Sequence, residues 1–273
     1  MKKTLLSCWV CLTISLLPAQ KIEEVTFTEK NKPLEGFGFK APVCNKDVLV
    51  NTWKTFIKKN GGKVKGGVIN KVTGSEIQFL QEGNTWSGYF AYSFNEDNTL
   101  TIYTSFQDMQ GDFLTSKNYK NEYDSLVTIL SGYRDSILKE CNLDDLNRAR
   151  AYSNTLSKEK IRNSDRILYL EKSNQSDKQK VTLSEGKDLT EKEKVSIEKV
   201  KQRIISNITE IQLLRDKNRI LDEQIKSQSL VIQRFETRKD HLEKGIELSS
   251  SDNADTSETV KKTDENTRDY FDR

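Results

Sequence analysis

A heptad repeat between Thr190 and Gly245 constrains the fold more than any other feature of the chain. Apolar residues recur there at alternating spacings of three and four, which keeps one stripe of a helix against a partner helix. No proline interrupts the repeat, and no glycine occurs between Lys187 and Lys244, so residues 190–245 are predicted to form a coiled-coil helix. The predicted seam consists of Ile197, Val200, Ile204, Ile211, Leu214, Asn218, Leu221, Ile225, Ile232, Phe235 and Leu242.

The ends of this helix carry recognisable signals. Thr190 and Glu193 have the spacing of a capping box, in which each side chain accepts a hydrogen bond from the other residue's backbone. Gly245 is suited to the left-handed conformation that commonly follows the last turn of a helix. Both signals place the helix within residues 190–245.

A seam requires a partner, and the sequence offers two. Residues 119–172 predict a first helical arm, which would fold back as an antiparallel hairpin with residues 173–189 as the connecting loop. The alternative is a parallel dimer with a second copy, which isoleucines at the first seam position and one buried asparagine favour. We favour the hairpin, in which Asn218 would lie near Asp144. Whether the first arm is continuous through 141–145 stays open.

Several apolar residues of the predicted coiled-coil helix lie off the seam. They are Ile205, Ile208, Leu213, Ile220 and Val231. Their exposure would leave room for a helical protein partner or for self-association. Most of the interleaved charged residues are expected to form a solvated face.

Residues 1–19 predict a secretory signal peptide. Lys2 and Lys3 form a basic start, and the mostly apolar stretch 5–17 is too short to span a bilayer. We favour this interpretation over lipid anchoring at Cys8, because almost no apolar stretch precedes that cysteine. The protein is therefore expected to be exported, to the periplasm or beyond, and the leader has a bacterial character. No later segment is apolar enough to cross a membrane.

Export would place the two cysteines outside the leader, Cys44 and Cys141, in an oxidising compartment. An even pair in an oxidising compartment can form a disulfide. Two buried free thiols are the alternative, and spacing alone does not decide between them.

Residues 20–113 predict a small two-layer α+β head. The sequence indicates an amphipathic helix after Asn45, which buries Trp53 and ends at Gly61-Gly62. That helix would cover a four- to five-stranded antiparallel sheet. The predicted strands are Lys21–Glu29, Val64–Val72, Glu76–Gln81, Thr85–Phe94 and Thr99–Phe106. Residues 36–39 receive no assignment. The polar residues 246–273 predict a disordered tail.

The sequence predicts no catalytic residue, no cofactor site and no metal site. Its single histidine, His241, lies near the end of the coiled-coil helix, which excludes histidine-dependent triads and ordinary zinc sites in the head. Glycine-rich phosphate loops and calcium loops do not occur. Three weaker possibilities are carboxylates in and beside the sheet, a lysine cluster around Lys58 to Lys71, and a ligand pocket lined by Trp53, Trp86 and Phe90.

These observations predict an exported, non-enzymatic structural or interaction protein of the bacterial cell envelope. It would present a small α+β head on a coiled-coil hairpin. The alternative function is a ligand- or glycan-binding module with a coiled-coil spacer or oligomerisation region. A net charge of +3, which falls to +1 without Lys2 and Lys3, does not suggest a nucleic-acid binder.

Overall fold

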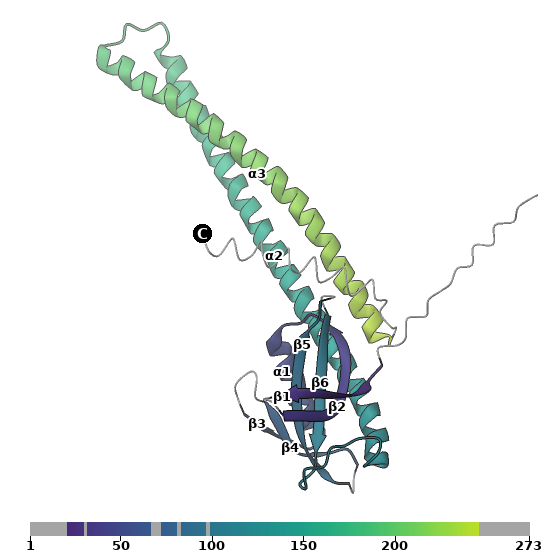
Figure 1. Ribbon diagram of the computed structural model, residues 1–273. Helices are drawn as coiled ribbons and strands as arrows, with labels where there is room; N and C mark the ends of the chain where they lie inside the picture. The colour runs from purple at the N-terminus through teal and green to yellow at the C-terminus, as the bar shows by residue number, and fades with distance from the viewer. Residues whose placement is uncertain (1–20, 30–31, 67–71, 81–82, 97–98, 246–273) are drawn as a thin grey trace, which may run out of the picture. The chain divides into compact units, whose positions relative to one another are not determined.

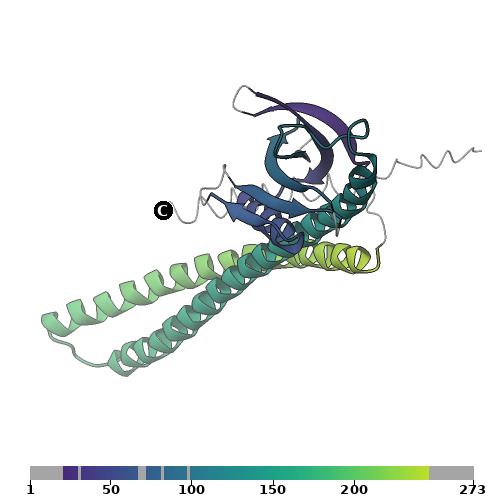
Figure 2. The ribbon, with the colours of Figure 1, turned by 90° about the horizontal axis from the view of Figure 1, so that it is seen from below.

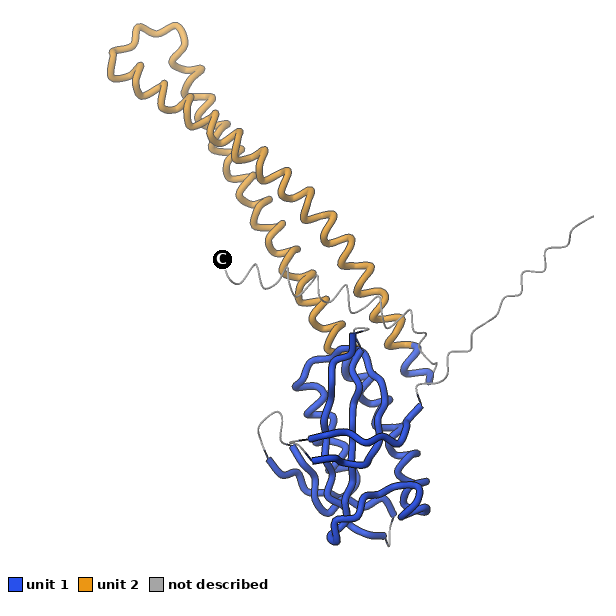
Figure 3. The backbone as a smooth tube through the Cα atoms, viewed as in Figure 1, with its two compact units in different colours: residues 1–141, 241–258 blue, residues 142–240, 259–273 orange. Residues whose placement is uncertain are grey.

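The computed structural model describes residues 21–29, 32–66, 72–80, 83–96 and 99–245. The described residues form two compact units, shown in different colours in Figure 3. Unit 1 comprises the residues up to Cys141 together with those from His241 onward, and unit 2 comprises Asn142–Asp240. The predicted signal peptide, Cys8 and the predicted disordered tail lie outside the described residues.

Unit 1 contains one antiparallel sheet of six strands, which confirms the predicted α+β class (Figure 1). The strand order across the sheet is β1-β2-β6-β5-β4-β3. The predicted count of four to five strands is therefore corrected to six. The strands are β1 (Glu23–Glu29), β2 (Lys32–Pro42), β3 (Lys63–Lys65), β4 (Thr73–Gln78), β5 (Thr85–Phe94) and β6 (Thr99–Gln107).

The additional strand is β2, whose glycines and prolines argue against a strand when the sequence is considered alone. The two prolines lie near its ends, and the glycines meet crowded neighbours within the sheet. A Cβ atom on Gly36 would lie 2.2 Å from the carbonyl oxygen of Thr104, and one on Gly38 would lie 3.2 Å from Val25. Close approach of the neighbouring strand thus requires glycine at position 36, and space at position 38 is tight.

Helix α1 (Lys46–Lys59) covers the apolar face of this sheet, as predicted. The side chain of Asn45 caps it by accepting a 2.9 Å hydrogen bond from the backbone N–H of Asp47. Trp53 is fully buried at the centre of the core, where it stacks on Phe56 and Phe90. Figure 2 shows the strong curvature of the sheet, with α1 and the first turns of α2 against it.

Helix α2 (Lys120–Ser184) begins within this core. Its first five turns contribute Leu126, Leu130, Tyr133 and Ile137 to the same buried cluster as Trp53. The head boundary predicted at residue 113 therefore moves to Cys141, because apolar residues at the start of the predicted first helical arm are core residues of unit 1.

Unit 2 contains the rest of α2 and most of α3 (Glu191–Glu243), which are joined by residues 185–190. Helix α2 continues through 141–145 and through most of the predicted loop 173–189. The predicted capping box of α3 is confirmed: Thr190 donates a 2.8 Å backbone hydrogen bond to Glu193, whose own N–H donates to the Thr190 hydroxyl. Gly245 adopts a positive φ of 70° after the last turn.

The two helices of unit 2 run antiparallel, but their register differs from the predicted one. Asn218 hydrogen-bonds to Asn163 at 3.0 Å rather than lying near Asp144. The prediction was wrong because it ended the first arm at residue 172, which displaced the pairing by 19 residues. Among the residues that the structure describes, no helix has the apolar length needed to cross a membrane.

Candidate functional site

The predicted seam faces inward along α3. None of its eleven residues is exposed, whereas the neighbouring apolar residues Ile205, Ile208, Leu213 and Ile220 are at least half exposed. The buried seam residues are Ile211, Leu221, Phe235 and Leu242. The half-buried ones are Ile197, Val200, Ile204, Leu214, Asn218, Ile225 and Ile232.

Two asparagine pairs interrupt the apolar packing of the hairpin. Asn163 and Asn218 form one, and Asn218 also donates to the hydroxyl of Ser164. Asn174 and Asn207 form the second, at 2.8 Å. Because a buried amide without a partner is costly, these pairs favour one register of α2 on α3.

A third polar contact lies near the connecting loop. Arg203 donates two hydrogen bonds of 2.6 Å to Asp177, whose side chain is only 3% exposed. These bonds hold the pKa of Asp177 below its usual value, with a further contribution from Lys180. The contacts of Asn174 and Asp177 were not predicted from the sequence, because both residues were expected to lie in a loop. A signal was present: residues 170, 174, 177 and 181 continue the spacing of three and four.

One flank of the hairpin comprises the residues that directly precede seam positions on both helices, and it carries two ion pairs between the helices. It also carries three exposed apolar side chains, Tyr169, Leu213 and Ile220, with exposed fractions of 63%, 66% and 50%. Arg166 contacts Glu210 at 2.7 Å, and Lys217 contacts Glu159 at 2.5 Å. Ion pairs therefore cover part of the seam on this side.

The opposite flank carries exposed apolar side chains, each of which directly follows a seam position. We name Ile161, Leu168, Ile205 and Ile208 the apolar strip. Their exposed fractions are 60%, 55%, 58% and 51%. Exposed apolar side chains gathered along one flank are typical of a surface that contacts another protein.

A groove of about 830 Å³ adjoins the apolar strip. Its lining includes Asn174, Gln175, Ile208, Ile211 and Arg215. Arg215 forms a 2.7 Å ion pair with Glu171 across the two helices. The groove thus combines apolar side chains with a neutralised pair of charges, a chemistry suited to packing against another helix.

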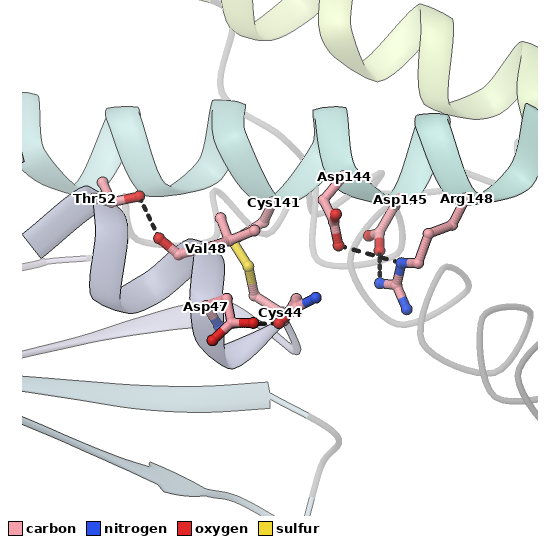
Figure 4. The surroundings of a disulfide bond; sticks show 9 residues. Cys44, Asp47, Val48, Thr52, Cys141, Asp144, Asp145 and Arg148 are labelled. Carbon is pink, nitrogen blue, oxygen red and sulfur yellow. Dashed lines mark hydrogen bonds and ion pairs between the residues drawn. A yellow bond between two sulfur atoms is a disulfide. The ribbon is translucent and has the colours of Figure 1, made fainter. Parts of the chain in front are cut away.

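Unit 1 contains a disulfide between the two cysteines whose pairing the sequence alone did not decide. Cys44 and Cys141 are bonded, with their Cα atoms 5.4 Å apart (Figure 4). The bridge joins the residue just before the cap of α1 to α2, 97 positions along the chain.

The other candidate residues have structural roles. Trp53 and Trp86 are at most 1% exposed, and the indole N–H of Trp53 donates to the Val72 carbonyl, so they belong to the packed core of the sheet. Lys58, Lys59, Lys63 and Lys65 are exposed, and Lys63 pairs with Glu76. Lys71 lies outside the described residues.

Among the candidate carboxylates, Asp108 has a structural role. Asp108 accepts a 2.6 Å hydrogen bond from the Tyr119 hydroxyl and two more from backbone N–H groups, which holds its pKa below the usual value. It fixes the loop that leads to α2 and is poorly suited to donate a proton. Glu82 and Asp97 lie outside the described residues. The described part of the chain contains no cluster of His, Cys, Asp and Glu that could hold a metal.

Buried Asp145 gives unit 2 a predicted dependence on pH. Burial raises its pKa to about 6, although Arg148 and Arg238 act in the opposite direction and Asp144 adds to the increase. The folded-state pKa is raised above the unfolded-state value near 4, so the contribution of this group to the stability of unit 2 is fully present below pH 4. The contribution is lost as the pH rises through about 6. We expect unit 2 to lose about 2–3 kcal/mol of unfolding free energy between pH 4 and pH 7 from this group.

Helical circular dichroism during denaturant unfolding at several pH values measures this effect. Asp145→Asn retains an acceptor for Arg148 and should remove this loss, so its unfolding free energy should rise relative to that of the unmodified protein between pH 4 and pH 7. The comparison separates Asp145 from Asp177, Glu193 and Glu210, whose lowered pKa values act in the opposite direction in both proteins. Parallel pH profiles for the two proteins would contradict the assignment.

Comparison with known proteins finds no matching family model, no matching curated protein and no matching solved structure.

Proposed function

We propose that this chain is an exported, non-enzymatic structural or interaction protein of the bacterial cell envelope. Its helical hairpin acts as a coiled-coil interaction element, and unit 1 is the compact domain that it carries. The observation that supports this proposal most strongly is the apolar strip, four apolar side chains that are each more than half exposed and lie beside a groove on one flank of the hairpin.

Two further observations fit the proposal. The Cys44–Cys141 disulfide suits an oxidising compartment, as an exported protein would encounter. The residues considered for chemistry in unit 1 serve its core and its turns, with Trp53 packed and Asp108 held in its ionised form. The second observation favours a binding role over catalysis.

A photo-reactive amino acid placed in the full chain tests the interaction role in the producing cells. We expect a benzoylphenylalanine at Ile208, on the apolar strip, to form covalent protein adducts. The same residue at Glu210, on the flank with the ion pairs two positions away, is the matched control and should form few. Equal adduct yields at the two positions, or none at either, would argue against the hairpin as an interaction element.

A further inference from the structure

The flank that carries the apolar strip has a symmetric pattern on α3. Glu198, Ile205, Ile208 and Arg215 are separated by seven, three and seven residues. Three of them directly follow a seam residue, and Ile208 follows the half-buried Asn207. A two-fold rotation about the point between residues 206 and 207 exchanges the two isoleucines. It also exchanges Glu198 with Arg215, which carry opposite charges. A copy of α3 placed antiparallel on this flank would therefore meet complementary side chains over residues 198–215. The next pairs outward, Lys194 with Arg219 and Glu191 with Asp222, carry like charges, but each of these residues has an ion-pair partner within its own hairpin.

Helix α2 has the same symmetry at the same level of the hairpin. Glu171 and Lys178 directly follow seam residues, carry opposite charges and have their midpoint between residues 174 and 175. Asn174 contacts Asn207 at 2.8 Å, so the midpoints on the two helices lie side by side. We call the contact between Asn174 and Asn207 the asparagine layer. A single two-fold axis at this layer therefore relates opposite charges on both helices.

The charges at each end of such an interface would balance. Arg215 and Glu171 already form an ion pair within one hairpin. The rotation brings the partner's Lys178 and the partner's Glu198 to this pair, which gives two acids and two bases. Burying them together avoids the large cost of a buried unpaired charge. Ile208 and Ile211 line the groove at this level, which has room for side chains of a second hairpin.

We propose that the α3 part of the apolar strip, Ile205 and Ile208, binds a second copy of this chain, packed antiparallel across the flank to form a four-helix bundle. Ile205 of each copy packs on the partner's Ile208, and Glu198 pairs with the partner's Arg215. This inference rests on the proposed function, because it names the partner of the interaction surface. Residue 142 lies 32 residues of helix from the asparagine layer, so the two copies of residue 142 would lie about 100 Å apart along the bundle. The dimer would then be a spacer with two distant attachment points.

Light scattering of the full chain over a range of concentrations tests the copy number. We expect a molar mass of twice 31.4 kDa at high concentration. Ile205→Asp and Ile208→Asp should each raise the dissociation constant by about 30-fold or more, because each places a charge at the centre of the interface. Leu213→Asp is the matched control, since Leu213 is 66% exposed on α3 but does not follow a seam residue. Unchanged helical circular dichroism would show that all three variants fold.

A charge exchange tests the antiparallel arrangement. Glu198→Arg and Arg215→Glu should each weaken the dimer, and the double variant should restore it, because the two positions face each other between copies. A dimer that the double variant fails to restore would overturn the antiparallel packing. A monomer at all concentrations would overturn the second copy as partner. If the protein is monomeric, adducts from position 208 to a different protein would still support the proposed function. Absence of adducts would contradict both the proposed function and the second copy as partner.

Discussion

Reduction of the Cys44–Cys141 disulfide is expected to lower the unfolding free energy of unit 1 by about 4–5 kcal/mol. The bridge spans 97 positions, and the chain-entropy account assigns about this much to closing a loop of ~100 residues. The two cysteines are 8% and 1% exposed, so the reduced thiols can remain packed as small apolar groups. The loss should therefore arise mainly from the greater freedom of the unfolded chain.

Tryptophan fluorescence during denaturant unfolding, with and without reductant, measures this loss. Trp53 and Trp86 both lie in the core of unit 1, so the signal reports on that unit. The control is the double variant Cys44→Ala, Cys141→Ala, which should match the reduced protein and should not respond to reductant. Coincident unfolding curves for the oxidised and reduced protein would contradict the expected contribution of the bridge.

The parts of the fold that follow from local rules could be predicted from the sequence. The capping box at Thr190, the amphipathic helix bearing Trp53 and the alternating strand Thr85–Phe94 are each specified by residues close together in the chain. The inward face of α3 was also predictable, because a heptad repeat fixes which residues share a stripe. In these regions local propensity and tertiary packing favour the same structure.

The errors arise where a distant partner changes the role of a residue. Gly36 and Gly38 disfavour a strand when the sequence is considered alone. In the sheet, the neighbouring strands leave no space for a larger residue at position 36. Asn174 and Asp177 are polar enough to suggest a loop, yet Asn207 and Arg203 satisfy them across the hairpin. Leu130 and Ile137 have seam-like spacing but belong to the core of unit 1. Periodicity indicates that a face is buried without indicating what covers it.

The candidate site was predictable only in part. The sequence identified Ile205 and Ile208 as apolar residues off the seam. Their grouping with Ile161 and Leu168 depends on the register between the helices, which the predicted loop placed incorrectly. The two-fold pattern of Glu198 and Arg215 is present in the sequence, but it gains meaning only when the contact between Asn174 and Asn207 aligns it with Glu171 and Lys178.

Leu221→Asn is expected to lower the unfolding free energy of unit 2 by about 4 kcal/mol. Leu221 is 4% exposed on the seam. Its replacement removes about 2–3 kcal/mol of apolar burial and leaves a buried amide without the kind of partner that Asn163 provides for Asn218, which costs about 1–3 kcal/mol more. Thermal and denaturant unfolding followed by helical circular dichroism measure the change.

The adjacent residue supplies the control for this prediction. Ile220 is 50% exposed, so Ile220→Asn introduces the same amide one position away on the solvent side. We expect it to cost less than about 1 kcal/mol, because water can satisfy the amide and little apolar contact is lost. Similar losses for the two variants would mean that the seam is not the face on which α3 packs. The flank assigned to the apolar strip would then be wrong as well, because that flank is defined by its position next to the seam.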